Sequence, residues 1–378
     1  MGYITLDDQA TLASVESDSH GFIRQLGSKR VVPDEFQHGQ GLIPAIKKAS
    51  DKLEPSKKGK FLLTDPADIF RSARTQESLP GHMARLELFP LSLDEITNQS
   101  LNIIDYLLKE NFQSTTVPFT SREELARVVL SGDYPEAQSK SPRAKQAWFN
   151  SYMEGRLYQD FETLYAARGD YYSKLQAMAP YLAGLSGNLL KCASIGNDFD
   201  LNDKLVKSYI EIFDLMFIVR HVPAYLKNHA KRLAVRIPKI HYVDTGLACH
   251  LLGIRNEDQL LTSQYYGSLL ESLVYMECCK QASWAQEVVG TYHFRDNKQH
   301  EVDMVFERTN GQIIGIEVKA SASVKSQDFK GLSVLADFSG KAFEQGVLFY
   351  IGQEILPFKH GDRTFYAVPL GLIWSDGG

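Results

Sequence analysis

Two short charged segments near the C-terminal end constrain the fold most. Glu301-Val-Asp303 precedes an apolar segment, 304–306, and Glu317-Val-Lys319 follows another, 313–316. Residues 308–311, Arg-Thr-Asn-Gly, form a turn sequence between the two apolar segments. Apolar runs joined by such a turn predict a β-hairpin.

The charges on this hairpin are unusual for buried strands. Asp303 stands among apolar neighbours, and the two-residue period of a strand predicts that Glu317 and Lys319 share one face. Burying such charges costs several kcal/mol unless they are paired. The sequence therefore predicts a cluster of charges with a role. The alternative is a solvated hairpin that carries charges at its ends.

Two carboxylates and a lysine in this arrangement have a known chemical use. The pattern resembles the PD-(D/E)XK nuclease fold, in which an Asp ends one strand, (D/E)-x-K lies on the next and a Glu comes from a preceding helix. Glu271, in an apolar helix-like segment, is the candidate for that Glu. The resemblance implies that Asp303, Glu317 and Glu271 are ligands of Mg²⁺ and that Lys319 stabilises the charge of a phosphate.

Composition predicts a soluble, multidomain protein of 378 residues. The hydrophobic content is 44%, the charged content is 23% and the net charge is −5, so an affinity for nucleic acid has to be local. We see no membrane-spanning segment and no signal peptide, and the four cysteines have no C-x-x-C spacing. These features favour a cytoplasmic location, reduced thiols and no membrane partner, while oligomer formation stays open.

The first hundred residues alternate short strands with helices. Strands are predicted at 3–6, 29–32 and 60–64, and a helix at 42–53. This alternation predicts a parallel α/β sheet.

The amino-acid sequence of the chain resembles that of a prokaryotic family of AAA-type ATPases. In that family a P-loop domain precedes a C-terminal region with a winged helix and a nuclease-like core. The segments that carry the resemblance are 31–37, 61–64, 78–83, 88–92, 132–136, 242–246 and the hairpin region. The resemblance implies a Walker-B-like pair at Asp34 and Glu35.

The chain departs from this family in its nucleotide-handling features. G-x-x-x-x-G-K-[ST] occurs nowhere in the sequence, so the backbone cradle and the lysine for the phosphates are absent. Pro33 precedes Asp34, and residues 65–68 and 81–82 differ from the usual family sequence. We therefore expect a degenerate ATPase-like domain that does not bind ATP. An alternative is an ATP-binding protein whose true start lies upstream.

The middle of the chain is predicted to be largely helical. Helices are expected at 94–110, from the capping-box sequence 121–124 onward and over 142–184. The aromatic residues of the last segment favour a bundle core over a base-stacking platform.

Residues 182–243 have the pattern of a winged helix. A first helix is predicted at 183–193, a recognition-type helix at 204–213, and wing strands at 217–220 and 232–235. Residues 215–243 contain no Asp or Glu. A DNA-facing surface is therefore predicted from Lys204, Lys207, Lys227, Lys231, Arg232, Arg236 and Lys239. The alternative is a solvated or protein-binding wing.

Together these patterns predict an α/β protein with four segments. They are a degenerate P-loop ATPase-like parallel-sheet domain (1–93), a helical extension (94–181), a winged-helix segment (182–245) and a PD-(D/E)XK nuclease-like domain (246–378). Two functions remain open. The chain is a Mg²⁺-dependent phosphodiesterase acting on nucleic acid, or it is a non-catalytic DNA-binding or regulatory scaffold.

Overall fold

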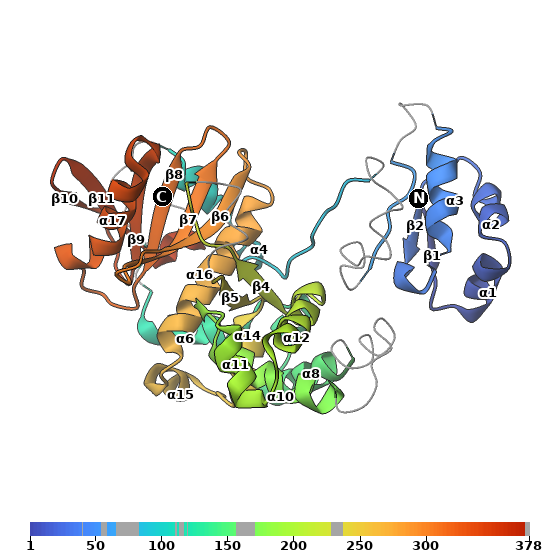
Figure 1. The fold of residues 1–378 in the computed structure, drawn as a ribbon, viewed down its shortest axis with the longest axis horizontal. Helices are drawn as coiled ribbons and strands as arrows, with labels where there is room; N and C mark the ends of the chain where they lie inside the picture. The colour runs from blue at the N-terminus through green and yellow to red at the C-terminus, as the bar shows by residue number, and fades with distance from the viewer. Residues whose placement is uncertain are drawn as a thin grey trace. The chain divides into compact units, whose positions relative to one another are not determined.

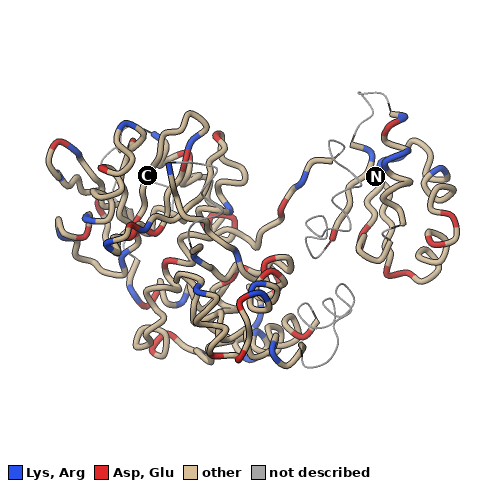
Figure 2. The backbone as a smooth tube through the Cα atoms, viewed as in Figure 1, with Lys and Arg blue, Asp and Glu red and all other residues tan. Residues whose placement is uncertain are grey.

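The computed structural model describes residues 1–39, 41–53, 59–65, 83–109, 112, 117–118, 120–155, 171–227 and 237–374. The chain forms two compact units, one built mainly on Met1–Leu88 and the other mainly on the residues from Phe89 onward (Figure 1). Acidic and basic residues are interspersed along the chain (Figure 2). Within the described ranges no helix is both long enough and apolar enough to cross a membrane.

The N-terminal unit has the predicted parallel α/β character. Strand β1 (Gly2–Thr5) pairs in parallel with β2 (Val31–Asp34), and residues 60–64 run beside β2, where the Val31 amide donates to the Lys60 carbonyl at 2.9 Å. The helices are α1 (Gln9–Ser17), α2 (Ser19–Gln25), the 3₁₀ helix η1 (Phe36–Gly39) and α3 (Leu42–Ser50). Leu42, Ile43 and Ile46 of α3 lie in the buried core, as the apolar spacing predicted.

The single helix predicted at 94–110 is wrong. The structure has two short helices, α4 (Leu93–Thr97) and α5 (Ile103–Leu107). Asn98 ends α4 in a left-handed conformation, and the Asn102 side chain accepts from two amides at the start of α5. Asparagine suits both positions, which explains the interruption.

The rest of the middle segment is helical, with the predicted capping box at Ser121 and Glu124 confirmed. The helices are α6 (Arg122–Ser131), α7 (Pro135–Gln138), α8 (Pro142–Met153), α10 (Tyr171–Gly184), α14 (Thr245–Leu251) and α15 (Glu257–Thr262). Aromatic rings cluster around α8, where Tyr134 and Trp148 lie 4.8 and 5.1 Å from Tyr152, measured between ring centroids. These three rings are half-buried and pack on one another. Residues 156–170 lie outside the described part.

A small three-stranded sheet follows α10. Its order is β3-β5-β4, from β3 (Asn188–Leu189), β4 (Val219–Val222) and β5 (Lys239–Tyr242). The helix predicted at 183–193 is wrong, because α10 ends at Gly184 and β3 precedes α11 (Cys192–Phe199). Gly187 has φ +80°, which suits the turn into β3. The helix predicted at 204–213 is confirmed as α12 (Asp203–Leu215), whereas 232–235 lies outside the described residues.

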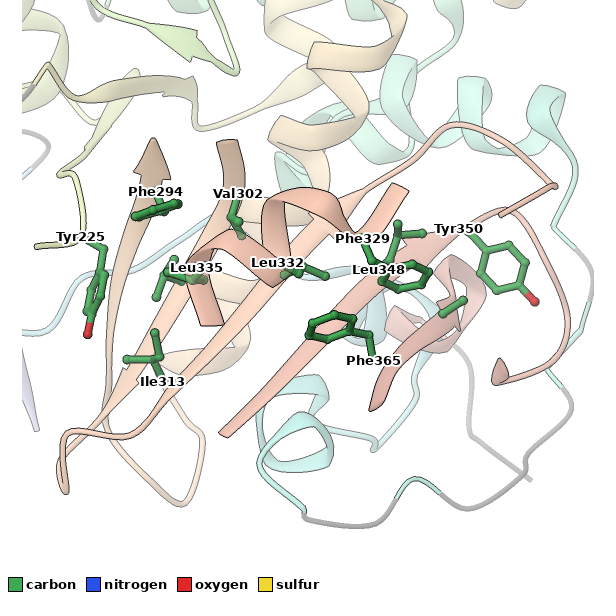
Figure 3. Close-up of a cluster of buried hydrophobic side chains, with 12 residues drawn as sticks. Tyr225, Phe294, Val302, Ile313, Phe329, Leu332, Leu335, Leu348, Tyr350 and Phe365 are labelled. Carbon is green, nitrogen blue, oxygen red and sulfur yellow. The ribbon is translucent and has the colours of Figure 1, made fainter. Parts of the chain in front are cut away.

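The C-terminal sheet has the order β10-β11-β9-β8-β7-β6. The predicted hairpin is confirmed as an antiparallel pair, β7 (Glu301–Arg308) and β8 (Ile313–Val318). The other strands are β6 (Val289–Arg295), β9 (Phe343–Tyr350), β10 (Leu356–His360) and β11 (Arg363–Pro369). Helix α17 (Lys330–Ser339), preceded by η5 (Ser326–Phe329), follows the hairpin. Its Leu332 and Leu335 pack on one face of the sheet (Figure 3).

Helix α16 (Tyr266–Ala282) joins the middle segment to this sheet and is buried along most of its length. It lies against β5 and β8. Its C-terminal half carries Glu277, Lys280 and Gln281, which bind the segments around residues 91–94, 102–103 and 133. Two of the segments that carry the sequence resemblance, 88–92 and 132–136, therefore meet at this helix.

Candidate carboxylate site

A buried ion-pair cluster occupies the region that the hairpin motif predicted. The ammonium of Lys239 on β5 lies 2.6 Å from Oε1 of Glu271 on α16 and 3.2 Å from Oδ1 of Asp303 on β7. Lys239 is 2% exposed. Three elements that are remote in sequence thus place their charged groups together.

A β-bulge places Asp303. Tyr292 pairs with Val305 and Phe294 pairs with Val302, so Asp303 and Met304 together stand opposite His293 alone. Such a bulge changes the alternation of side chains locally and is frequent beside active sites. Oδ2 of Asp303 also accepts from the amide of Val318 at 2.9 Å, which ties the carboxyl to the neighbouring strand.

Packing of β5 on α16 places Lys239 and Glu271. Lys239 and His241 are alternate residues of β5 and share a face. Nδ1 of His241 lies 3.0 Å from Oγ of Ser272, and its ring stacks on Tyr275, with centroids 4.3 Å apart. Since Glu271 adjoins Ser272 on α16, this contact brings its carboxyl within reach of Lys239.

Glu317 and Lys319 both reach the region of η5 and the start of α17, but the Lys319 ammonium is not part of the Lys239 cluster. Glu317 is partly buried, and its Oε1 lies beside the first turn of α17, where a Cβ on Gly331 would come within 2.3 Å. The Lys319 ammonium instead pairs with Asp328 of η5. Strand β8 ends at Val318, and the amide of Lys319, the next residue, donates to the Phe349 carbonyl of β9 at 2.8 Å.

Burial and mutual charge shift the titration of these groups. Burial raises the pKa of Glu271 to about 8, with the Asp303 charge adding to the rise and Lys239 opposing it. Burial and the charge of Asp303 also raise the pKa of Glu317 well above its usual value. For Lys239, burial alone would lower the pKa, but the charges of Glu271 and Asp303 outweigh burial and leave it raised. The cluster therefore carries a surplus of negative groups around one cation.

The three predicted metal ligands are not drawn together as a closed ligand set. Among the described residues, only Asp7, Glu35 and His38 form a group of at least three acidic, histidine or cysteine side chains with ligand atoms all within 4.8 Å. Two of that group are exposed, and exposed acidic groups of this kind are common without a metal. In the predicted site, the ammonium of Lys239 holds the position between Glu271 and Asp303.

A pocket of about 300 Å³ adjoins the cluster. Lys239 and Glu301 line one part of it, and Tyr181, Asn188 and Lys191 line another. Arg295 also lines the pocket and pairs with Glu301. The pocket therefore connects the carboxylate cluster with the α10–α11 region.

The predicted DNA-facing lysines have different environments. Lys204, Lys207 and Lys227 are exposed, and the ammonium of Lys227 lies 5.2 Å from the centroid of the Phe338 ring. Lys239 was also expected to face DNA, but it is buried, which corrects this expectation. The sequence did contain a signal for this burial, because Lys239 stands in a short strand of otherwise uncharged residues. The same reasoning identified Asp303 as an unusual charge. Lys231, Arg232 and Arg236 lie outside the described residues.

The Walker-B-like pair lies at the end of β2. Both carboxylate oxygens of Asp34 accept hydrogen bonds, one from Thr64 and one from Tyr3, and the Thr64 and Tyr3 bonds lower the pKa of Asp34. Glu35 has φ +53°, a left-handed conformation. The side chain of Asp34 is thus engaged within the N-terminal unit.

Comparison with known families divides the chain into three parts. Residues 1–97 match a family model described as an AAA domain. Residues 122–258 match a domain of unknown function (DUF8612), and residues 266–373 match another (DUF4143). The match over residues 1–97 agrees with the AAA part of the expected resemblance.

Two curated relatives are uncharacterized proteins from Mycobacterium bovis and Mycobacterium tuberculosis. Each is 24% identical over 345 residues, which is 91% of this chain and 69% of the relative. A crystal structure of a protein from Vibrio cholerae matches 94% of this chain and 74% of its own, at 12% identity and a TM-score of 0.20. That score carries no argument about the fold, and none of these descriptions names a nuclease or a DNA-binding protein.

Proposed function

We propose that this protein acts on nucleic acid through a Mg²⁺-dependent phosphodiesterase site in residues 246–378. The observation that carries the proposal is the meeting of Glu271 and Asp303 around one buried cation, with Glu317 on the strand next to Asp303. Buried carboxylates with strongly shifted pKa values are typical of functional sites.

The donor chemistry fits a hard divalent cation. Carboxylate oxygens are the ligands that Mg²⁺ prefers, and the raised pKa values of Glu271 and Glu317 reflect crowded negative charge that a cation would relieve. Asp303 and Glu317 would hold the ion, and Glu271 would hold it or orient a water. Bound Mg²⁺ would supply a Lewis acid and a more acidic water.

The motif lysine needs a separate role. Lys319 pairs with Asp328 and is not part of the Lys239 cluster. In the proposed reaction its ammonium would have to leave Asp328 before it could stabilise a phosphate. Asp328 is therefore a residue that holds Lys319 away from the carboxylates.

The middle segment supports a nucleic-acid partner. Its order is helix α10, strand β3, helices α11 and α12, then strands β4 and β5, with the sheet order β3-β5-β4. We assign this order to a winged helix, in which α12 is the recognition-type helix with Lys204 and Lys207 exposed.

Cleavage tests the proposal. End-labelled single-stranded and duplex DNA should be cut in Mg²⁺ or Mn²⁺ and not in EDTA. Asp303→Asn should abolish cleavage, whereas Asp337→Asn, a control at an exposed carboxyl of α17, should leave it unchanged. Cutting that survives in Asp303→Asn would locate the activity elsewhere. Absence of cutting in the wild type with every DNA form would overturn the proposed reaction.

The salt dependence of binding tests the DNA partner separately. Each phosphate contact contributes roughly 0.9 log units of affinity per decade of salt. Substituting Lys231, Arg232 and Arg236 with Ala should flatten the slope for duplex DNA, and so should Lys204→Ala with Lys207→Ala. An unchanged slope in both variants would place any DNA contact on another surface.

A non-catalytic scaffold is the second candidate. The observation in its favour is that Lys239 already neutralises charge between Glu271 and Asp303. In a scaffold, removal of any member would leave a buried charge unpaired and cost several kcal/mol, and added metal would have no effect.

A further inference from the structure

The cation of the carboxylate cluster comes from outside the C-terminal sheet. Lys239 belongs to β5, whose neighbours are β3 and β4, whereas Asp303 belongs to β7. The side chain of Lys239 is 3% exposed, and those of Glu271 and Asp303 are 14% and 13% exposed. The ammonium is therefore removed from water and contacts these two carboxylates instead.

A divalent cation at this site would need the same oxygens. Lys239 contacts Oε1 of Glu271 and Oδ1 of Asp303, while Oδ2 of Asp303 is engaged by the Val318 amide. An ammonium and a metal ion cannot both occupy the space between the two carboxylates, because both are cations and need direct contact with the same oxygens.

The neighbouring pocket offers a place for a displaced ammonium. Lys239 lines the pocket of about 300 Å³ together with Asn188, Tyr181 and Glu301. The flexible stem of a lysine allows the ammonium to move while the backbone stays in β5. Glu301 is an acceptor on the pocket side of the cluster.

We propose that Lys239 is a tethered competitor of the divalent cation: it occupies the carboxylates in the metal-free protein and moves into the pocket when the metal binds. This inference rests on the metal site of the proposed function. It adds that Lys239, a residue of the winged-helix segment, sets the metal affinity. Lys239 lies outside the motif formed by Asp303, Glu317 and Lys319.

Metal affinity of matched variants tests the competition. Mn²⁺ binding would be measured by electron paramagnetic resonance of the full chain for the wild type, Lys239→Met and Lys298→Met. Lys239→Met removes the ammonium and keeps an unbranched side chain, so Mn²⁺ should bind more tightly by roughly 5- to 150-fold, a typical range for coupled sites. Lys298→Met is the control, because this lysine is exposed and is not part of the proposed site, and its affinity should stay within twofold of the wild type.

Lysine labelling of the wild type provides a second measurement that does not depend on folding of a variant. Reductive methylation followed by mass spectrometry should modify Lys239 slowly without metal and faster with saturating Mn²⁺. Lys280 is an internal control, because it is fully buried between Asp133 and Glu277 and should stay protected in both conditions. An unchanged rate at Lys239 in the metal-bound protein would overturn the displacement.

The outcomes separate this inference from the proposed function. Equal Mn²⁺ affinities of wild type and Lys239→Met would overturn the competition but leave a metal-dependent enzyme possible. Tighter Mn²⁺ binding by Lys239→Met, together with no DNA cleavage by the wild type, would support the competition and overturn the proposed reaction. Absence of Mn²⁺ binding in every variant would overturn both.

Discussion

Lys280 and Asp133 lie 147 residues apart in sequence, yet the ammonium of Lys280 lies 2.6 Å from Oδ2 of Asp133. The same ammonium lies 2.6 Å from Oε1 of Glu277 and 2.9 Å from the carbonyl oxygen of Leu91. The side chain of Lys280 has no solvent exposure. One buried cation therefore joins two remote segments, around Leu91 and Asp133, to α16.

Removing that cation should strongly destabilise the chain. Lys280→Met leaves Asp133 and Glu277 buried without their partner, which costs about 3–5 kcal/mol in comparable sites. Lys298→Met, at an exposed position, should change stability by less than about 0.5 kcal/mol. Urea unfolding of both variants measures the difference. A Lys280→Met variant as stable as the control would show that the network does not stabilise the fold.

A second prediction concerns the close approach of Gly132 to Asp244. Gly132 has φ +62°, and a Cβ there would lie 2.4 Å from Oδ1 of Asp244. That carboxyl accepts from the amides of Asp133 and Leu247, so moving it would lose two charge-assisted bonds. Gly132→Ala should therefore lower the free energy of unfolding.

Gly361→Ala is the matched control for that prediction, because Gly361 has φ +61° and a Cβ there meets nothing within 4 Å. Both variants carry the strain of an alanine at positive φ, and Gly132, with ψ −177°, lies in a region that glycine alone adopts readily. The Gly132 variant should lose at least ~2 kcal/mol more, since bonds to a charged group are worth about 1.5–3 kcal/mol each. Equal losses would mean that Asp244 adapts at no cost.

A third prediction concerns acid stability. Burial, together with the charge of Arg255, lowers the pKa of His250 to about 4 from 6.5. The unfolded chain therefore binds this proton more readily, and His250 contributes stability above pH 6.5 that is lost as the pH falls towards 4. The slope is at most ~1.4 kcal/mol per pH unit, reduced here because the ring is half exposed.

His250→Gln should flatten this dependence between pH 6.5 and 4, as measured by urea unfolding at several pH values. The exposed His360→Gln variant is the control and should keep the wild-type slope. A steep slope retained in His250→Gln would assign the acid sensitivity to other groups.

A fourth prediction concerns nucleotide. The sequence contains no P-loop, and the oxygens of Asp34 accept from Thr64 and Tyr3. Millimolar MgATP should therefore leave the melting temperature unchanged. A ligand at 100 times its Kd would add ~2.7 kcal/mol, which a melting curve detects readily. A saturable rise in melting temperature with ATP would contradict the degenerate assignment.

Local patterns in the sequence were sufficient for much of the C-terminal domain. Apolar runs joined by a turn sequence predicted the β7–β8 hairpin, and helical spacing predicted α16 around Glu271. Each of these depends on residues that are close in sequence. The same reasoning failed at 94–110, where two asparagines divide a predicted helix into two.

The set of residues that form the site depends on tertiary contacts, which local sequence patterns do not show. Lys239 reaches Glu271 and Asp303 only through the packing of β5 on α16, and the bulge at Asp303 arises from its pairing with β6. The partner of Lys319 lies in η5, beyond the motif. Sequence therefore predicted the carboxylates, whereas the identity of their cation required the tertiary structure.

The most direct test of the account is the position of Mn²⁺ in crystals of the full chain soaked with this ion. Anomalous diffraction should show Mn²⁺ bound by Asp303 and Glu317, beside Glu271, with the ammonium of Lys239 moved away from Asp303. Mn²⁺ absent from these carboxylates, with Lys239 still between Glu271 and Asp303, would contradict the metal site and make the cluster a structural ion pair.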